Sequence, residues 1–170
     1  NVLSDTTNVF SFANNPSISY VADRFGNANS AVNINNSGST ATLPSLPYGS
    51  TSRSVAMWVK LNTLNSAGFN FLYNYGTSAT GNGAYLNATN IIHFGSGANH
   101  STTSSTVLNT WMYLVFTYDG TTSRIYRDGA LISTQTLTLN TVNNSNIFRL
   151  GLSEEGIAGF FNGAIDDLKI

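Results

Sequence analysis

The clearest alternation of apolar and polar residues lies in the third quarter of the chain, where it predicts a β-meander. Three runs of strand length follow one another there, at residues 111–118, 123–127 and 131–139. They are separated by Asp119-Gly120 and Asp128-Gly129, dipeptides that supply the positive φ angles of tight hairpin turns. A helix is excluded because both dipeptides would lie in its interior and no apolar stripe of period 3.6 is present.

Shorter runs elsewhere predict further strands. These lie at residues 8–12, 30–34, 54–61, 69–75, 84–88, 90–95, 147–152 and 161–170. Residues 13–20 and 96–106 are polar, without periodicity, and are predicted to be loops. No helix longer than a turn is predicted. About a dozen short strands indicate an all-β fold, a two-sheet antiparallel β-sandwich.

The period of two also assigns side chains to faces within each predicted strand. In the run 54–61, Val55 and Val59 share one face and Trp58 lies on the other. In the run 69–75, the same count places four aromatic residues on one face, namely Phe69, Phe71, Tyr73 and Tyr75. Trp58 and Trp111 lie within long apolar strands and are expected to pack in the core.

The amino-acid composition excludes several classes of function. Charged residues make up 9% of the chain and the net charge is −1, so there is no basic surface for nucleic acid or an anionic membrane. No apolar run is long enough to predict a transmembrane helix. Cysteine is absent, which excludes disulfides, thiol catalysis and thiolate metal sites. Neutral polar residues replace the usual charges, which favours a secreted or cell-surface β-protein.

Four regions carry a family resemblance, and the first of them, the meander, contains two adjoining blocks. The block N-T-W-x-x-L-V-x-T-Y-D-G ends at Gly120, and I-Y-R-D-G-x-L-I follows it. Together with Asp23–Ala28 and Ser54–Lys60 before them and Phe161–Ile170 after them, they follow the order of laminin-G-like domains, which are concanavalin A-like jelly rolls, and resemble them. The resemblance spans roughly residues 23–170. It implies one laminin-G-like domain over residues 1–170, and the first residue, Asn1, suggests excision from a larger modular surface or secreted protein.

Candidate ligand-binding residues are aromatic and polar. Tyr73, Tyr75 and Tyr85 combine an apolar ring with a polar tip, which suits a half-wet binding face, although the core is an alternative place for them. His100 lies in the predicted loop 96–106, where it is expected at the rim of a binding site. A zinc site shared with His93 is disfavoured because no third ligand is evident.

Carboxylates are too few and too scattered to favour an enzyme. Glycosidases need two carboxyl groups facing each other across the scissile bond. Asp119 and Asp128 are explained by hairpin turns, and the adjacent Glu154 and Glu155 would point to opposite faces of a strand. The strand motif of the jelly-roll glucanases, Glu-x-Asp-x-x-Glu, is absent, as is a Gly-x-Ser-x-Gly elbow. The chain is therefore expected not to be an enzyme.

The resemblance implies a structural calcium ion. Asp166 and Asp167 are adjacent on the last predicted strand, so one of them needs a partner at the interior or at an edge. The family pattern implies that Asp166 binds calcium together with oxygens near Asn14 and Asn35. The alternative is that Asp166 pairs with an arginine or accepts hydrogen bonds.

Together these observations predict a non-catalytic extracellular module that binds carbohydrate or mediates adhesion. Its partners would be a glycan, a polysaccharide or a cell-surface glycoprotein, bound through a sheet face and loops. Two alternatives remain, a structural spacer or protein-binding domain without a glycan site, and a small polysaccharide-active enzyme.

Overall fold

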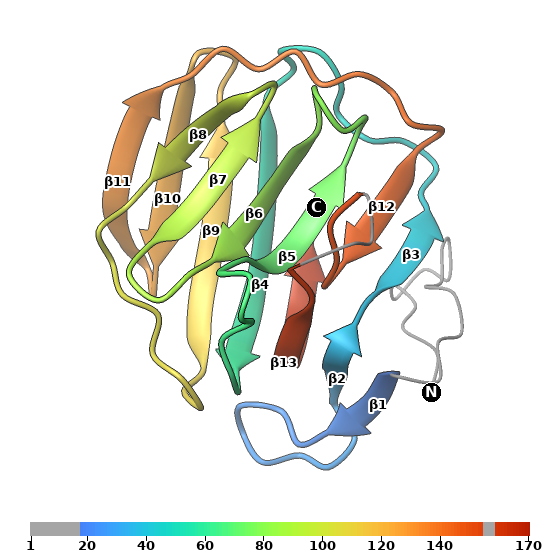
Figure 1. Cartoon of the computed structure of the whole chain (residues 1–170), viewed down its shortest axis with the longest axis vertical. Helices are drawn as coiled ribbons and strands as arrows, with labels where there is room; N and C mark the ends of the chain where they lie inside the picture. Colours follow the sequence, from blue (N-terminus) through green and yellow to red (C-terminus); the bar gives the residue numbers. More distant parts are fainter. Residues whose placement is uncertain (1–17, 155–158) are drawn as a thin grey trace.

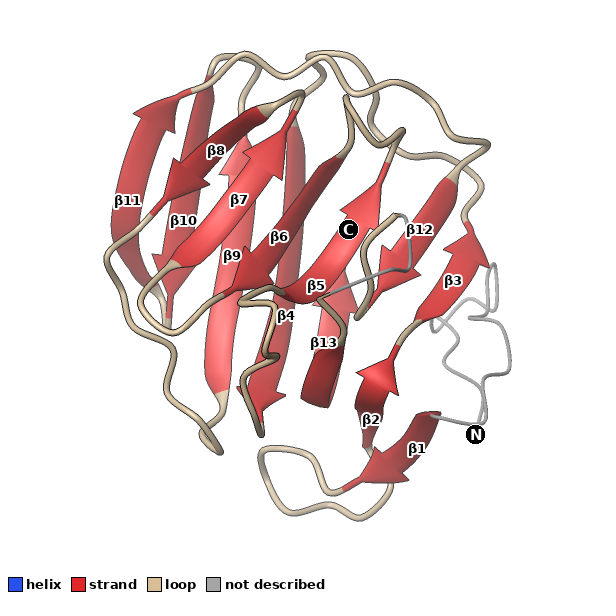
Figure 2. Ribbon diagram, in the orientation of Figure 1, coloured by secondary structure: helices blue, strands red, loops and turns tan. Residues whose placement is uncertain are grey.

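The computed structural model describes residues 18–154 and 159–170, which form two antiparallel sheets and no helix (Figure 2). The strands of the first sheet are β1 (Ile18–Val21), β2 (Ala31–Ser37), β4 (Arg53–Leu61), β9 (Met112–Tyr118), β10 (Thr122–Arg127), β11 (Ala130–Thr136) and β13 (Phe161–Lys169). Those of the second are β3 (Ser39–Thr42), β5 (Asn70–Tyr75), β6 (Asn82–Leu86), β7 (Ile91–Gly95), β8 (Ala98–Ser101) and β12 (Ile147–Leu150). The predicted strand at residues 8–12 lies outside the described residues.

The two sheets pack face to face as a sandwich (Figure 1). The order is β1-β2-β13-β4-β9-β10-β11 in the seven-stranded sheet and β3-β12-β5-β6-β7-β8 in the six-stranded sheet. The predicted all-β, two-sheet fold is confirmed. Within the described residues there is no helix long and apolar enough to cross a bilayer.

The predicted meander is present as β9, β10 and β11, which are neighbours in the seven-stranded sheet. Arg127 pairs with Ala130, so Asp128 and Gly129 form a two-residue turn. Their φ angles are 52° and 85°, and positive values at both positions are typical of the type I′ turn that hairpins prefer. The Asp-Gly signal therefore located this hairpin correctly.

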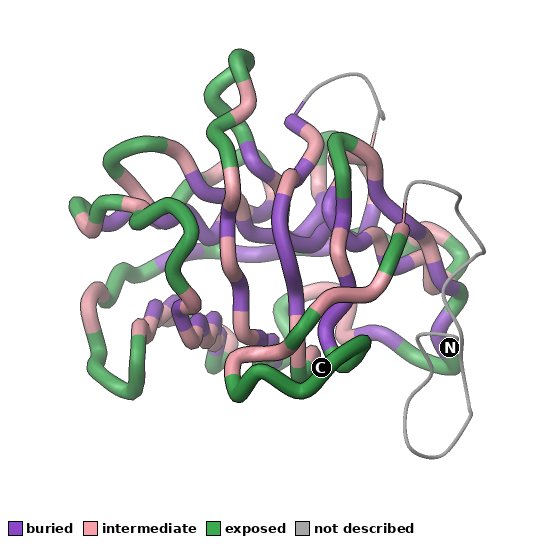
Figure 3. The backbone as a smooth tube through the Cα atoms, turned by 90° about the horizontal axis from the view of Figure 1, so that it is seen from below, coloured by how far each residue is buried: buried purple, intermediate pink, exposed green. Residues whose placement is uncertain are grey.

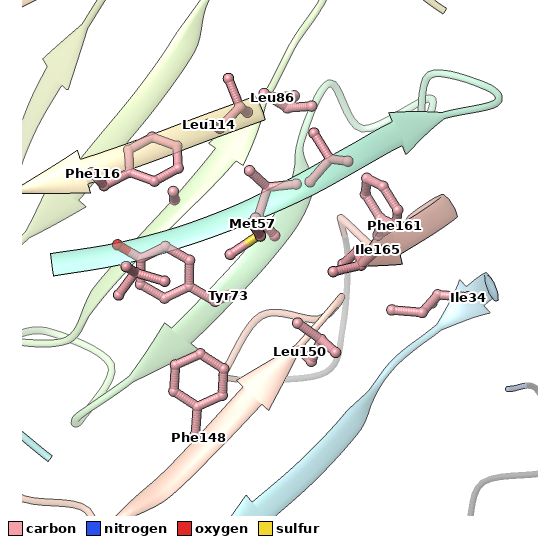
Figure 4. Packing of buried hydrophobic residues seen from close by; sticks show 14 of the residues in the cluster. Ile34, Met57, Tyr73, Leu86, Leu114, Phe116, Phe148, Leu150, Phe161 and Ile165 are labelled. Atoms are coloured by element: carbon pink, nitrogen blue, oxygen red, sulfur yellow. The ribbon is translucent and has the colours of Figure 1, made fainter. Parts of the chain in front are cut away.

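The core lies between the sheets and is lined by alternate residues of the strands (Figures 3 and 4). In β4, Val55, Met57 and Val59 point inward and are at most 1% exposed, as the period of two predicted. The opposite face of β4 does not follow the prediction, because Trp58 is only half-buried and lies on the outer face of the sheet. Trp111 is also half-buried, so neither tryptophan is a core residue.

A β-bulge in β5 changes which of its aromatic residues face the core. Phe71 pairs with Tyr85, whereas the next paired residue, Tyr73, lies opposite Ala84, so Leu72 is the extra residue. A bulge reverses the alternation of side chains beyond it. Phe71 therefore points outward while Tyr73 and Tyr75 point into the core, and the prediction that all four aromatic residues share a face is wrong.

Two strands lie in segments predicted to be loops. β1 occupies the end of the segment 13–20, and β8 lies within the segment 96–106. The inward positions of β8 hold Ala98, which is small, and His100, which is polar. The strand therefore shows no alternation of large apolar residues with polar ones. The pattern of apolar residues could not identify such a strand.

Candidate functional site

The outer face of the six-stranded sheet carries a patch of partly exposed aromatic side chains. Phe71, Tyr85 and Phe94 point outward from the neighbouring strands β5, β6 and β7, and Phe69 precedes β5 on the same side. The ring centroid of Tyr85 lies 5.2 Å from that of Phe69 and 5.4 Å from that of Phe71. Phe94 lies 5.8 Å from Phe71 and 5.9 Å from Tyr85. We call Phe69, Phe71, Tyr85 and Phe94 the aromatic patch.

Gly83 of β6 allows the ring of Phe94 to lie close against the sheet. Gly83 is directly opposite Phe94, and a Cβ atom at Gly83 would lie 2.5 Å from the Phe94 ring. A side chain at this position would therefore push the ring outward. Phe94 is held over β6, next to Tyr85.

Beside the aromatic patch, the sheet register aligns a row of polar residues across the strands. Asn74 of β5 is opposite Arg149 of β12, which is opposite Thr40 of β3. On the other side of the patch, Phe94 is opposite Asn99 of β8. Directly opposite residues point to the same face of a sheet. We call Thr40, Asn74, Asn99 and Arg149 the polar row.

Two members of the polar row have polar atoms without partners. Asn74 is 5% exposed, and its side-chain oxygen makes no hydrogen bond with any described residue. The Nη1 atom of Arg149 is likewise buried and has no hydrogen-bond partner there. Buried polar groups are nearly always paired, so these two atoms have hydrogen-bonding capacity that the described residues leave unused.

The aromatic patch and the polar row together offer two kinds of contact. Aromatic rings present flat apolar surface, and the Tyr85 hydroxyl adds a polar tip. Burial raises the pKa of Tyr85, so this phenol remains a hydrogen-bond donor at neutral pH. Amide and guanidinium groups donate to, and amide oxygens accept from, hydroxyl groups. A molecule with both an apolar face and many hydroxyls fits this arrangement.

Of the three predicted tyrosines, only Tyr85 lies on this surface. Tyr73 and Tyr75 are 0% exposed and pack in the core, where the Tyr73 ring stacks on that of Phe148 at 5.7 Å (Figure 4). They cannot contact a ligand on the outer face, so their assignment as ligand-binding residues is corrected. The bulge in β5 is the cause.

His100 does not lie at a rim. It is 0% exposed, and its two ring nitrogens lie 2.8 Å from the hydroxyls of Ser123 and Ser133 on the opposite sheet. The same Ser123 hydroxyl lies 2.7 Å from Nδ1 of His93. This serine between two histidines resembles a nucleophile–base pair, but it is buried and no described carboxylate joins it. His100 is therefore a structural residue, and its predicted ligand contact is corrected.

The residues predicted to bind calcium do not converge in the described structure. Nη1 of Arg24 lies 2.6 Å from the Asp166 carboxylate, which is the arginine pairing left open as an alternative. Asn35 is opposite Asn162, four residues before Asp166 on β13, so the two are separated by roughly 13 Å along the strand. Asn14 lies outside the described residues. Among residues 18–154 and 159–170 there is no group of three or more His, Asp or Glu side chains placed to hold a metal ion.

Burial and the neighbouring Asp167 raise the pKa of Asp166, and Arg24 opposes them. The second nitrogen of Arg24, Nη2, lies 2.8 Å from Asp167. One guanidinium thus holds both carboxylates of the last strand. No site for a cation is left ready at Asp166 in the part of the chain described.

Two further aspartates, Asp119 and Asp128, serve turns or ion pairs. The Asp119 carboxylate accepts hydrogen bonds from the backbone of Thr121 and Thr122 and pairs with Arg124 at 2.6 Å. Asp128 accepts a hydrogen bond from the backbone of Tyr113. These contacts give each carboxylate a structural role and bring no two of them together across a cleft.

Comparison with known protein families identifies a family for this fold. A family model described as the concanavalin A-like lectin/glucanases superfamily matches residues 35–170. No curated protein matches the chain.

Several solved structures share the fold. Domain 4 of AbnA, a GH43 extracellular arabinanase from Geobacillus stearothermophilus solved in complex with arabinotriose, aligns with a TM-score of 0.73 at 21% identity. The alignment covers 98% of this chain and 85% of that one. The Botulinum neurotoxin serotype G binding domain aligns with a TM-score of 0.74 at 16% identity, over 97% of this chain and 44% of that one. A putative carbohydrate-binding protein from Bacteroides ovatus aligns with a TM-score of 0.59 at 16% identity, over 74% of this chain and 38% of that one. At these identities the likeness shows the fold alone.

Proposed function

Because the chain belongs to the concanavalin A-like lectin/glucanases superfamily, we propose that it is a non-catalytic module that binds a neutral glycan on the outer face of its six-stranded sheet. The observation that carries this proposal is the aromatic patch lying beside a polar row with unpaired atoms. The patch supplies stacking surface for a sugar ring. The polar row supplies hydrogen bonds to its hydroxyls.

The roles of the residues follow from their positions. Tyr85 is at the centre of the patch, so its ring stacks on the sugar and its hydroxyl donates to it. Phe69, at 44% exposed, extends the stacking surface. The unpaired atoms of Asn74 and Arg149 are buried, so these side chains bond hydroxyl groups of the same sugar after small movements.

The arabinotriose complex of the similar arabinanase domain supports a glycan as the ligand, and arabinotriose is a suitable first probe. That enzyme is described as extracellular, which supports a location outside the cell for this chain as well. The toxin binding domain is more than twice as long as the region it shares with this chain, which supports a place within a longer protein. The low content of charged residues also favours an extracellular location.

Calorimetry with a panel of neutral oligosaccharides that includes arabinotriose tests the proposal. We expect Tyr85→Ala to weaken the binding of a panel member about tenfold or more, which corresponds to roughly 1.4 kcal/mol. Tyr126→Ala is the matched control, since Tyr126 is a half-buried tyrosine on the outer face of the other sheet. Absence of binding by every panel member would contradict the proposal and favour a spacer or protein-binding domain, as would equal loss in both variants.

The structural calcium ion remains a separate proposal, since Asn14 lies outside the described residues. It predicts a melting temperature that falls when a chelator is added and recovers with calcium but not with magnesium, which requires a tighter octahedral site. A melting temperature unaffected by the chelator would contradict it and leave Asp166 as the partner of Arg24 alone.

A further inference from the structure

The outer face of the seven-stranded sheet, on the opposite side of the sandwich, carries a second group of aromatic side chains. Trp58 of β4 is directly opposite Tyr113 of β9, and their ring centroids lie 5.2 Å apart. Trp111 precedes β9, beside Lys60. All three aromatic residues are half-buried, and Arg24, in the loop between β1 and β2, contacts the Trp58 ring from outside.

Both lysines of the chain are on this face. Lys60 is two residues from Trp58 on β4 and points to the same side, and its Nζ lies 5.2 Å from the Trp111 ring. Lys169 of β13 is opposite Ala56, which is two residues from Trp58 in the other direction. Trp58 therefore lies between two cationic side chains. We call Trp58, Lys60, Trp111, Tyr113 and Lys169 the tryptophan face.

The charges of the two lysines are not compensated within the described residues. The ion pairs there use arginines only: Arg24 binds Asp166 and Asp167, Arg124 binds Asp119, and Arg127 binds Asp128. Each of these carboxylates is thus already occupied. The tryptophan face combines partly exposed ring surface with two positive charges that no described carboxylate pairs with.

Arg24 fixes the ring of Trp58. Its guanidinium carbon lies 4.8 Å from the Trp58 ring and 4.3 Å from that of Phe25, while Asp166 holds the guanidinium from the side. A cation between two aromatic rings is a favourable arrangement. The position of Trp58 between the two lysines is therefore set by the protein before any ligand binds.

We propose that the tryptophan face is a second binding site, which takes an acidic polysaccharide built from uronate sugars. The sugar rings pack on Trp58 and Tyr113, and sugar carboxylates pair with Lys60 and Lys169. Because the lysines lie on either side of the tryptophan, at positions roughly 13 Å apart along β4, a chain of several linked acidic sugars fits better than one small anion. This site is independent of the neutral-glycan site proposed above.

The test compares two forms of one polymer, polygalacturonate and its fully methyl-esterified form, which differ only in charge. We expect the protein to bind polygalacturonate, with an affinity that falls as salt is added, and to bind the ester at least about tenfold more weakly. The double variant Lys60→Gln/Lys169→Gln should lower the affinity for polygalacturonate by about tenfold. Both lysines are at the surface, so this variant retains the fold, which a melting curve verifies. Trp58→Ala should also weaken binding, provided its melting curve remains cooperative.

Two controls separate this site from general charge attraction and from the neutral-glycan site. Arg149→Gln removes one positive charge from the opposite sheet, and Tyr85→Ala removes the centre of the aromatic patch; both should leave polygalacturonate binding within about twofold. The proposal is overturned by equal binding of the two polymers, by absence of polygalacturonate binding, or by an Arg149→Gln effect as large as that of the lysine variant. Failure of the neutral-glycan proposal appears separately, as absence of binding by the neutral panel.

Discussion

At the scale of single residues, a chain of buried polar groups joins the two sheets. The side-chain nitrogen of Asn82 donates to Nε2 of His93 at 3.0 Å, which leaves the His93 proton on Nδ1 to be donated to Ser123. Ser123 then donates to Nδ1 of His100, whose Nε2–H donates to Ser133. One direction of donation satisfies every ring nitrogen, and it requires both histidines to be neutral.

This series of buried hydrogen bonds makes the stability of the fold sensitive to acid. Burial lowers the pKa of His93 from 6.5 to about 3, and repulsion by Arg53, and by His100 whenever it is protonated, acts in the same direction. Burial also lowers the pKa of His100. Between pH 6.5 and about 3 the unfolded chain therefore binds a proton at His93 that the folded chain excludes, so the free energy of unfolding is undiminished above pH 6.5 and falls as the pH decreases through this window.

We expect His93 to contribute a slope of up to about 1.4 kcal/mol per pH unit, measured by urea denaturation at a series of pH values. His93→Gln keeps a polar side chain but does not titrate. It should lower the slope by up to about 1.4 kcal/mol per pH unit, which corresponds to one bound proton. An unchanged slope in this variant would show that His93 titrates normally and is not enclosed as described.

At the scale of the strand, the bulge in β5 decides which aromatic residues are available to a ligand. Phe71 lies before the bulge and faces solvent, and Tyr73 lies after it and faces the core. The Tyr73 hydroxyl is buried without a hydrogen-bond partner in the described structure, and burial raises its pKa well above the ordinary value. The hydroxyl is thus a cost to stability and makes no contribution to binding.

Tyr73→Phe should therefore raise the free energy of unfolding, by about 1 kcal/mol, because it removes a buried unpaired hydroxyl. Glycan binding should be unchanged, since Tyr73 lies on the opposite side of the sheet from the aromatic patch. Thermal melting and calorimetry measure the two effects. Lower stability together with weaker glycan binding would indicate that Tyr73 faces outward and that the bulge is misplaced.

The sequence predicted the elements with strong alternation and missed those whose alternation is interrupted. The strand β9 and most of the inward face of β4 agree with the prediction, because apolar residues mark the inward positions Met112, Leu114 and Phe116 of β9 and Val55, Met57 and Val59 of β4. β8 was missed because its inward positions hold Ala98 and His100. Counting in twos along the sequence cannot detect a β-bulge. It therefore could not reveal that Leu72 is an extra residue and that Phe71 and Tyr73 point to opposite faces of the sheet.

The candidate site was predicted only in part for the same reason. Tyr85 was identified from its chemistry, and its outward position follows from the regular alternation of β6. Asn74 and Arg149 were missed because they become neighbours only through the pairing of β5 with β12, which are far apart in the sequence. The pairing of Asp166 with Arg24 was foreseen as an alternative to calcium, but Arg24 itself was not identified.

At the scale of the whole molecule, the sandwich separates two surfaces of different chemistry. Within residues 18–154 and 159–170 no helix covers the outer face of either sheet, so aromatic side chains on both faces remain partly exposed there. The six-stranded sheet presents aromatic rings beside neutral amides and one arginine. The seven-stranded sheet presents aromatic rings between two lysines. A ligand that binds one face is thus distinguished from a ligand of the other by charge.

The central claim, that a neutral glycan binds on the outer face of the six-stranded sheet, is tested most directly by mapping the bound sugar. The measurement is a titration of isotope-labelled protein with the tightest-binding neutral oligosaccharide of the panel, followed by NMR of the backbone amides. We expect the shifted signals to belong to β5, β6, β7 and β12, with the largest changes at Phe71, Asn74, Tyr85 and Arg149. Changes confined to β4 and β9 of the opposite sheet, around Trp58 and Tyr113, would contradict the account.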